Sequence, residues 1–235
     1  MSDHHVAITE FETREELAQA LADQTADALR SAISDGGAAT LAVSGGSTPK
    51  LYFQKLSLAE LDWESVTVTL VDERWVPESS ERSNARLVKQ NLLQNEAHAA
   101  SFVPLYTGAA TPEEGIHEVA ERVADMSGPI TVAILGMGDD GHTASFFPGG
   151  DRLAYAIDPT SHLLVSPMRA EAAGEPRITL TLPVLLAATM LVLHVEGAGK
   201  KKVLETALAG KDANKMPIRA VVAHAPHPLQ IVWAP

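Results

Sequence analysis

The stretch that decides the fold runs from Ile130 to Gly150 and reads ITVAILGMGDDGHTASFFPGG. Its first six residues are mostly apolar and end at Gly136, a pattern typical of a buried strand. Three glycines follow within six positions, so the chain can turn sharply and bring backbone N–H groups close to a ligand. We expect His142, Thr143 and Ser145 to begin a helix. That would place the histidine at the carboxyl end of a strand, where open α/β sheets keep their sites.

The segment Gly136–Gly141 also fits G-x-G-x-x-G, a dinucleotide-binding fingerprint that is weak when it stands alone. Two aspartates inside the loop would repel a pyrophosphate. The loop also does not follow the first strand of the chain, where this fingerprint usually lies. A nicotinamide-dependent oxidoreductase is therefore the least favoured interpretation, and a tight turn that holds a structural histidine is left open by this stretch alone.

Strands and helices are expected to alternate through the rest of the chain. Helix starts are indicated by a capping pattern at Thr13, by Ser47 or Thr48 ahead of Pro49, and by Thr111. This order predicts an α/β fold with a parallel sheet covered on both faces, in a single domain of residues 1–235. Apolar or alternating segments predict strands at residues 6–11, 40–43, 66–71, 162–166, 177–182, 190–195 and 229–233.

Composition and charge limit the classes of function. The chain has no cysteine, which excludes disulfides and thiolate metal sites, and no apolar run approaches the roughly 20 residues that span a bilayer. Met1–His5 does not begin a signal peptide, so we expect a cytoplasmic protein with no membrane partner. The formal net charge of −12 argues against a nucleic-acid partner, but it allows a small anion that meets a few local cations.

The segment Ser44–Thr48, SGGST, follows an expected strand and precedes an expected helix. Small residues, free backbone N–H groups and hydroxyls at such a point favour an anion-binding loop, for which phosphate is the usual ligand. The spacing is not that of a Walker A loop. An ordinary capped turn is the alternative interpretation.

Charged residues directly follow the strand expected at 66–71. Burying Asp72, Glu73 and Arg74 at such a position is costly unless their charges are paired with each other or with a ligand. They could form a salt-bridged surface turn, or Arg74 could face a substrate oxygen. Arg177 and Lys200 are further cations at element boundaries, and each could equally be a solvated surface charge.

The histidines narrow the chemistry further. No H-E-x-x-H or comparable spacing occurs, so no dedicated metal site is expected. His4 and His5 lie in an N-terminal segment that we expect to be loose. Because the chain has neither a G-x-S-x-G elbow nor a cysteine, a histidine that acts on water is the remaining hydrolytic possibility.

The chain carries the following segments in this order: SGGSTP at 44–49, DERWVP at 72–77, Ser83-Asn84, LGMGDDGHTAS at 135–145, FPG at 147–149, RITLT at 177–181 and Gly197-x-x-Lys200. Together they resemble segments of the 6-phosphogluconolactonase family. The resemblance implies a three-layer α/β/α fold with a mostly parallel, Rossmann-like sheet, shared with glucosamine-6-phosphate deaminase. It also implies hydrolysis of 6-phospho-D-glucono-1,5-lactone to 6-phosphogluconate in the oxidative pentose phosphate pathway, without a cofactor.

The resemblance further implies roles for individual residues. His142 would be the general base for the attacking water, Asp140 would orient its ring, and Arg74 would hold either the carbonyl oxygen or the phosphate. The expected catalytic residues are therefore His142, Asp140 and Arg74. The expected substrate- and phosphate-binding residues are Ser44, Gly45, Gly46, Ser47, Thr48, Asp72, Asn84, Gly138, Gly141, Thr143, Arg177 and Lys200.

Two alternatives remain on the same fold: a glucosamine-6-phosphate deaminase or isomerase, and a non-catalytic sugar-phosphate-binding protein. The segments Thr143–Gly149 and Arg74–Pro77 favour the lactonase. Phe146 stands where the family more often has leucine. We expect a small-molecule substrate as the partner, no metal site, and a monomer or a weak homodimer.

Overall fold

The computed structural model describes residues 6–126, 128–227 and 229–235, so His4 and His5 lie outside the described residues. Its central feature is a seven-stranded parallel sheet with the order β1-β10-β9-β6-β2-β3-β5. The expectation of an α/β fold with a mostly parallel sheet is confirmed. The strands are β1 (Ala7–Glu10), β2 (Ala39–Val43), β3 (Val66–Leu70), β5 (Ser101–Val103), β6 (Val132–Leu135), β9 (Met190–Glu196) and β10 (Gln230–Ala234).

A second, antiparallel sheet has the order β4-β8-β7 and packs beside the first. Its strands are β4 (Asp72–Arg74), β7 (Val165–Met168) and β8 (Arg177–Leu180). From the sequence we expect the segments of β7 and β8 to belong to the parallel sheet and residues 72–74 to form a loop. Both expectations are wrong. The reason is that β4 begins only one residue after β3 ends, so the chain leaves the parallel sheet through Val71 and pairs with β8 instead.

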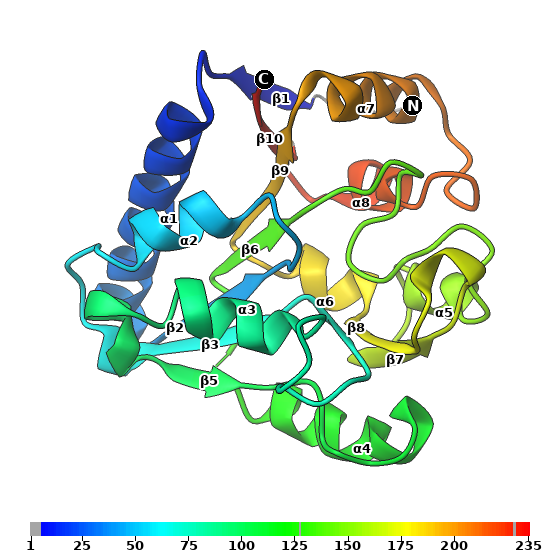
Figure 1. Cartoon of the computed structure of the whole chain (residues 1–235), viewed down its shortest axis with the longest axis horizontal. Helices are drawn as coiled ribbons and strands as arrows, with labels where there is room; N and C mark the ends of the chain where they lie inside the picture. Colours follow the sequence, from blue (N-terminus) through cyan, green and yellow to red (C-terminus); the bar gives the residue numbers. More distant parts are fainter. Residues whose placement is uncertain (1–5, 127, 228) are drawn as a thin grey trace.

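Helices cover both faces of the parallel sheet, which gives the three layers. Figure 1 shows α1 and α2 side by side against one face, with the region of α6 and β8 on the other. Within the described residues, no helix has the length and apolar character needed to cross a membrane. The helices are α1 (Arg14–Gly36), α2 (Lys50–Leu56), α3 (Asn84–Asn91), α4 (Pro112–Ala124), α5 (Leu153–Ala156), α6 (Leu182–Leu186), α7 (Ala198–Ala209) and α8 (Ile218–His224), with short 3₁₀ turns η1 (Trp63–Ser65), η2 (Asn95–Ala99) and η3 (Glu171–Ala173).

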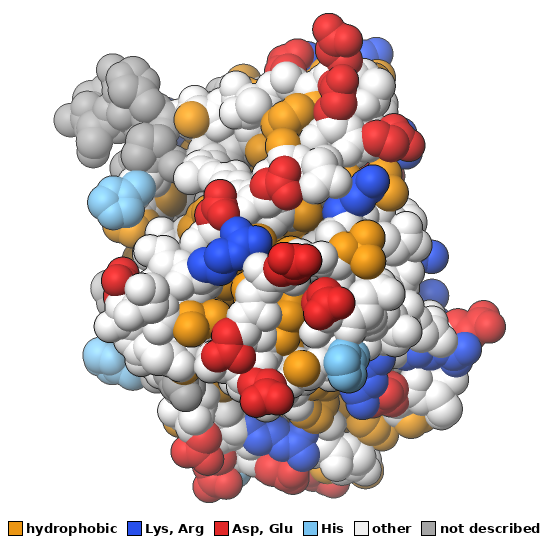
Figure 2. Space-filling model, turned by 90° about the vertical axis from the view of Figure 1, so that its left-hand side faces the viewer, with side chains coloured by type: hydrophobic (Ala, Val, Ile, Leu, Met, Phe, Trp, Pro, Cys, Tyr) orange, Lys and Arg blue, Asp and Glu red, His pale blue; other side chains and the backbone are white. Residues whose placement is uncertain are grey.

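One face of the molecule is mixed in charge (Figure 2). On the face shown in Figure 2, acidic and basic side chains are interspersed among small apolar areas. Positive charge is therefore not gathered into a broad patch on that face, as expected for a chain with a net charge of −12. An anion must find its cations in a local site instead.

The stretch after β6 does not continue as the helix that its sequence favoured. Residues 142–149 form a turn closed by a bridge between Thr143 and Phe146, and the next helix begins at Leu153. Ala144 has φ = 48°, in the left-handed region, and a right-handed helix cannot pass through such a residue. The predicted cap of α2 is wrong as well, because Pro49 is itself the N-cap and no side-chain cap bond forms.

The predicted start of α1 is confirmed. Thr13 is the N-cap, and its hydroxyl accepts a hydrogen bond from the Glu16 amide at 3.2 Å. The Glu16 carboxylate accepts in turn from the amide of Glu12 at 3.2 Å, one residue before the position in a standard capping box. The helix ends at Gly36, and the C-cap residue Gly37 has a φ of 77°, which glycine readily adopts; its amide donates to the carbonyl of Ile33 and closes the last turn.

Thr13→Ala should lower the free energy of unfolding by about 1 kcal/mol, because the first turn of α1 loses its cap. Urea unfolding measures this difference. Thr13→Ser is the matched control, since it keeps the capping oxygen and should stay within about 0.5 kcal/mol of the parent protein. Equal losses in both variants would show that the methyl group, and not the cap, is what matters at this position.

Candidate active site

A cavity of about 290 Å³ lies where the parallel strands β2, β6 and β9 end and the second sheet begins. It gathers side chains from loops that are far apart in the sequence. Three predicted site residues, Asp140, Gly141 and Thr143, do not line this cavity and lie in the loop behind His142. The predicted residues that line it are Ser44, Gly45, Gly46, Ser47, Thr48, Asp72, Arg74, Asn84, Gly138, His142, Arg177 and Lys200.

His142 is held by Asp140 through two hydrogen bonds. The distance from its Nδ1 to Asp140 Oδ1 is 2.6 Å, and its backbone amide donates to the same oxygen at 3.0 Å. An ionised carboxylate can only accept, so Nδ1 carries the proton and Nε2 of the neutral ring keeps its lone pair. The ring of Phe147 stacks on the imidazole, with 4.3 Å between centroids. The histidine is therefore fixed in a tautomer that can take up a proton at Nε2.

The electrostatics of Asp140 support this tautomer. Partial burial raises the pKa of Asp140, but the hydrogen bonds from the His142 ring and amide outweigh it and hold the pKa below its ordinary value. The stabilisation from this pairing is therefore present above the ordinary pKa of aspartate, and it is lost as the pH falls through the lowered pKa. The carboxylate stays ionised at neutral pH.

Steric crowding explains why residue 138, close to the His142–Asp140 pair, is a glycine. A Cβ atom on Gly138 would lie 2.2 Å from Nδ1 and Cε1 of His142 and 2.9 Å from the Asp140 carboxylate. Glycine is thus what permits the imidazole to lie against the backbone. Thr143 is fully buried and its hydroxyl donates to the carbonyl of Gly136 at 2.8 Å, so it shapes the loop from behind.

The segment after β2 forms one wall of the cavity. The hydroxyl of Ser44 donates to the carbonyl of Ile134 and accepts from the amide of Gly136, both at 3.0 Å. Its proton is therefore used to join β2 to β6. Ser47 is exposed and Thr48 half-buried, so backbone and hydroxyl groups further along the segment are open to a ligand.

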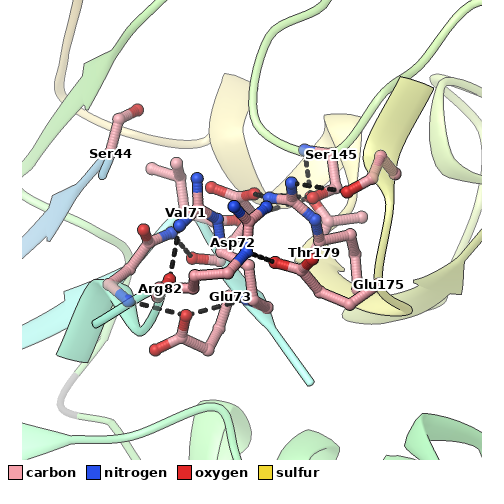
Figure 3. A network of polar contacts seen from close by, with 12 residues as sticks. Ser44, Val71, Asp72, Glu73, Arg82, Ser145, Glu175 and Thr179 are labelled. Carbon is pink, nitrogen blue, oxygen red and sulfur yellow. Dashed lines mark hydrogen bonds and ion pairs between the residues drawn. The ribbon is translucent and has the colours of Figure 1, made fainter. Parts of the chain in front are cut away.

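Arg177 lies in β8 and is almost completely buried. Its guanidinium is 3.6 Å from the Asp72 carboxylate, donates to the carbonyl of Ala173 at 3.1 Å, and lies over the ring of Phe147 at 5.3 Å. Burial lowers the pKa of Arg177, and the nearby Asp72 carboxylate partly offsets this. Figure 3 shows Asp72 inside this network, where it also accepts a 2.6 Å hydrogen bond from Ser145.

Arg74 is anchored from one side only. One of its terminal nitrogens donates to the carbonyl of Arg82, and its Nε is buried without a hydrogen-bond partner among the residues that the structure describes. Arg82 itself is exposed and pairs with Glu175 at 2.7 Å. Lys200 is half-buried in the first turn of α7 and supplies a further cation to the cavity.

Glu73 is a residue that the sequence analysis named but did not place in the site. It is fully buried, and its carboxylate accepts hydrogen bonds from the amides of Arg74, Asn84 and Ala85 at 2.7–2.8 Å and from the hydroxyl of Ser83 at 3.0 Å. Burial raises the pKa of Glu73, and these hydrogen bonds only partly counter it. The carboxylate fixes the start of α3 to β4, and so fixes Asn84 and Arg74 on the cavity.

Sequence reasoning also missed His194 and Phe147, which line the cavity, and Ser145 as the partner of Asp72. Phe147 could have been found, because it belongs to the quoted segment after β6. His194 gave no signal, since a histidine within an apolar strand is indistinguishable from a core residue by pattern. Among the described ranges, no three His, Asp or Glu side chains gather in a way that would hold a metal ion.

Comparison with known proteins identifies the class. The chain belongs to the family of glucosamine-6-phosphate isomerases and 6-phosphogluconolactonases, whose sequence model matches residues 12–233. A 6-phosphogluconolactonase of Rhizobium meliloti is 56% identical over 225 residues, which is 96% of this chain and 97% of that protein. The crystal structure of a 6-phosphogluconolactonase from Shewanella baltica has a TM-score of 0.95 at 39% identity and covers 98% of both chains. A monomeric glucosamine-6-phosphate deaminase, with a TM-score of 0.78 at 18% identity over 97% of each chain, shares the fold.

Glu73→Ala should lower the free energy of unfolding by about 1–3 kcal/mol, because three buried amides and a hydroxyl lose their acceptor. The sign of the pH dependence follows from the raised pKa. The contribution of Glu73 is fully present below the ordinary pKa of glutamate and is lost as the pH rises through the raised pKa. The difference in the free energy of unfolding between the parent protein and Glu73→Ala should therefore become smaller as the pH rises.

Urea unfolding across about pH 5–8 measures this trend. Glu81→Ala is the control, since Glu81 is exposed and lies in the same loop, and its effect should stay within about 0.5 kcal/mol. A loss in Glu73→Ala no larger than that of the control would contradict the anchoring role.

Proposed function

We propose that this chain hydrolyses 6-phospho-D-glucono-1,5-lactone to 6-phosphogluconate, a step of the oxidative pentose phosphate pathway. Relatives with 56% and 49% identity over 225 residues carry the name 6-phosphogluconolactonase, which supports this activity. The proposed mechanism rests mainly on one observation: the imidazole of His142, which is hydrogen-bonded to Asp140, lines the same cavity as Ser44–Thr48 and Lys200.

In the proposed mechanism, Nε2 of His142 removes a proton from water while the water oxygen bonds to the lactone carbonyl carbon. Asp140 stabilises the imidazolium that results, because it already accepts the Nδ1 proton. The tetrahedral intermediate then collapses. The bond from the carbonyl carbon to the ring oxygen breaks, and this oxygen takes the proton back from His142, which leaves the open-chain acid.

We assign the cationic side chains of the cavity to different ends of the substrate, the lactone ring and the phosphate. Arg177, one of the expected substrate- and phosphate-binding residues, packs over Phe147, whose ring also stacks on His142. We therefore assign Arg177, together with Arg74, to the lactone end, where a guanidinium stabilises the developing oxyanion. Lys200 and the segment 44–48 then bind the phosphate and hold the substrate in position for attack.

We also propose the setting in which this chemistry occurs. The chain works as one domain of residues 1–235, in the cytoplasm, as a monomer or a weak homodimer. Support for a single unit comes from the family match over residues 12–233 and from relatives that the chain covers almost completely. Sedimentation equilibrium tests the oligomeric state.

The experiment that tests the activity generates the lactone in place with glucose-6-phosphate dehydrogenase and follows its decay with and without the protein. Since the lactone also opens spontaneously, the expected result is a decay rate that rises in proportion to protein concentration. Decay at the spontaneous rate, or release of ammonia from glucosamine 6-phosphate in its place, would overturn the proposal.

His142→Ala should reduce kcat by roughly 10²–10⁴-fold, because the attacking water loses its general base. The affinity for 6-phosphogluconate should change little, since the phosphate contacts remain. His162→Ala is the control, because His162 is exposed and outside the cavity, and its kcat should be unchanged. Retained turnover in His142→Ala would eliminate His142 as the base.

Lys200→Ala should raise KM by roughly tenfold and leave kcat nearly unchanged, because the phosphate contact exists in both the ground state and the transition state. Steady-state kinetics separate the two parameters. Lys202→Ala removes an exposed lysine of the same helix and should leave both unchanged. An unaltered KM in Lys200→Ala would mean that the phosphate lies elsewhere.

A further inference from the structure

His194 is a buried histidine that the mechanism above does not use. It lies near the end of β9 and is 2% exposed. Because Leu193 pairs with Leu135, His194 is level with the point where the chain leaves β6 for the His142 loop. Its ring packs edge-on against Tyr52 of α2, the helix that the segment 44–48 leads into, with 6.3 Å between centroids.

The hydrogen bonding of this ring is incomplete. Nε2 of His194 lies 3.0 Å from Oε1 of Glu196, and an ionised carboxylate requires that Nε2 carry a proton. Nδ1 is buried and has no hydrogen-bond partner in the part of the chain that the structure describes. A buried polar atom without a partner is costly, and such atoms call for a specific explanation.

The cavity offers that explanation, because His194 is one of its lining residues. Lys200 follows in the next turn of the chain, after Gly197, and lines the same cavity. The segment from His194 to Lys200 thus contributes two residues to the cavity that residues 44–48 also line. In a chain with a net charge of −12, a phosphate needs such local donors.

Several charged or polar groups pack around the ring or line the same cavity. Glu196 accepts from Nε2, although Arg14 lies 3.5 Å from its other oxygen and competes for its charge. Tyr52 is neutral, because burial raises its pKa. Lys200 opposes a second cation when the cavity is empty, and a phosphate dianion between the two would reverse that balance.

We propose that His194 is a phosphate-binding residue that takes up a proton when a phosphate monoester enters the cavity, so that Nδ1–H donates to a phosphate oxygen while Nε2–H stays on Glu196. The proton comes from the solvent. The proposal rests on the assignment of the phosphate to the end of the cavity near Lys200. It makes this strand, and not only the glycine-containing loop, responsible for recognising the phosphate.

Two substitutions separate the nitrogens. His194→Asn places an amide near the position of Nδ1, whereas His194→Gln places one near the position of Nε2 and leaves nothing at Nδ1. The affinity for 6-phosphogluconate should fall by about tenfold or more in His194→Gln and by less in His194→Asn. Gluconate, which lacks the phosphate, should show no such difference between the variants.

Calorimetry in buffers of different ionisation enthalpy gives the number of protons taken up on binding. At about pH 8, where the phosphate is already a dianion, the parent protein should take up more protons than either variant. Equal proton uptake and equal affinity in all three proteins would overturn the proposal and leave His194 as a core residue. An equal loss of gluconate affinity would overturn it too, because the contact would then not be with the phosphate.

A measurement on the unaltered protein covers the case in which the variants fail to fold. ¹⁵N-histidine NMR during titration with 6-phosphogluconate should show Nδ1 of His194 changing from unprotonated to protonated, and an unchanged signal would refute the proposal. Inorganic phosphate serves as a second probe. If the protein fails to hydrolyse the lactone but phosphate still protonates His194, the proposed function fails while this inference stands.

Discussion

The short hydrogen bond between Nδ1 of His142 and the Asp140 carboxylate is the interaction on which the chemistry of the site depends. It decides which nitrogen of the imidazole is free, and it requires a backbone close enough for both side chains to meet over Gly138. The left-handed Ala144 then turns the chain away before a helix can form. A helix at this point would carry the histidine along a regular surface, whereas the turn presses Phe147 against its ring. The irregular backbone is therefore what orients the proposed base.

The second sheet helps to stabilise charged side chains that are buried at the end of β3. Asp72, Glu73 and Arg74 follow a strand whose end lies inside the molecule, where unpaired charges are costly. Pairing β4 with β8 brings Arg177 to Asp72, while the start of α3 supplies amides to Glu73. Asp72 thus finds donors from elements distant in sequence, and Glu73 from the start of the next helix. The same contacts place two guanidinium groups at the cavity, so the stability of this region and its proposed chemistry share the same residues.

Much of this arrangement could be predicted from the sequence, because it follows from local pattern. The buried strand before Gly136, the cap at Thr13 and the grouping of polar loops at strand ends all depend on residues near each other in the chain. The parallel order then brings the loops together. What could not be predicted depends on long-range pairing or on one backbone angle. The partner of β4 is more than 100 residues away, and nothing near Ala144 announces a positive φ.

The contacts of His194 also could not be predicted from local sequence. In addition, His194 suggests a way for an acidic protein to bind an acidic substrate. Within β9 the residue occupies an apolar position and reads as part of the core. Its meaning appears only when Glu196 two residues later, Tyr52 from α2 and the cavity wall are considered together. A permanent extra cation there would add to the charge of Lys200 and raise the cost of the empty site. A group that gains its charge together with the ligand avoids this cost, because the proton and the phosphate then stabilise each other. A buried histidine held by a carboxylate has the chemistry that this requires, since its second ring nitrogen can accept a proton.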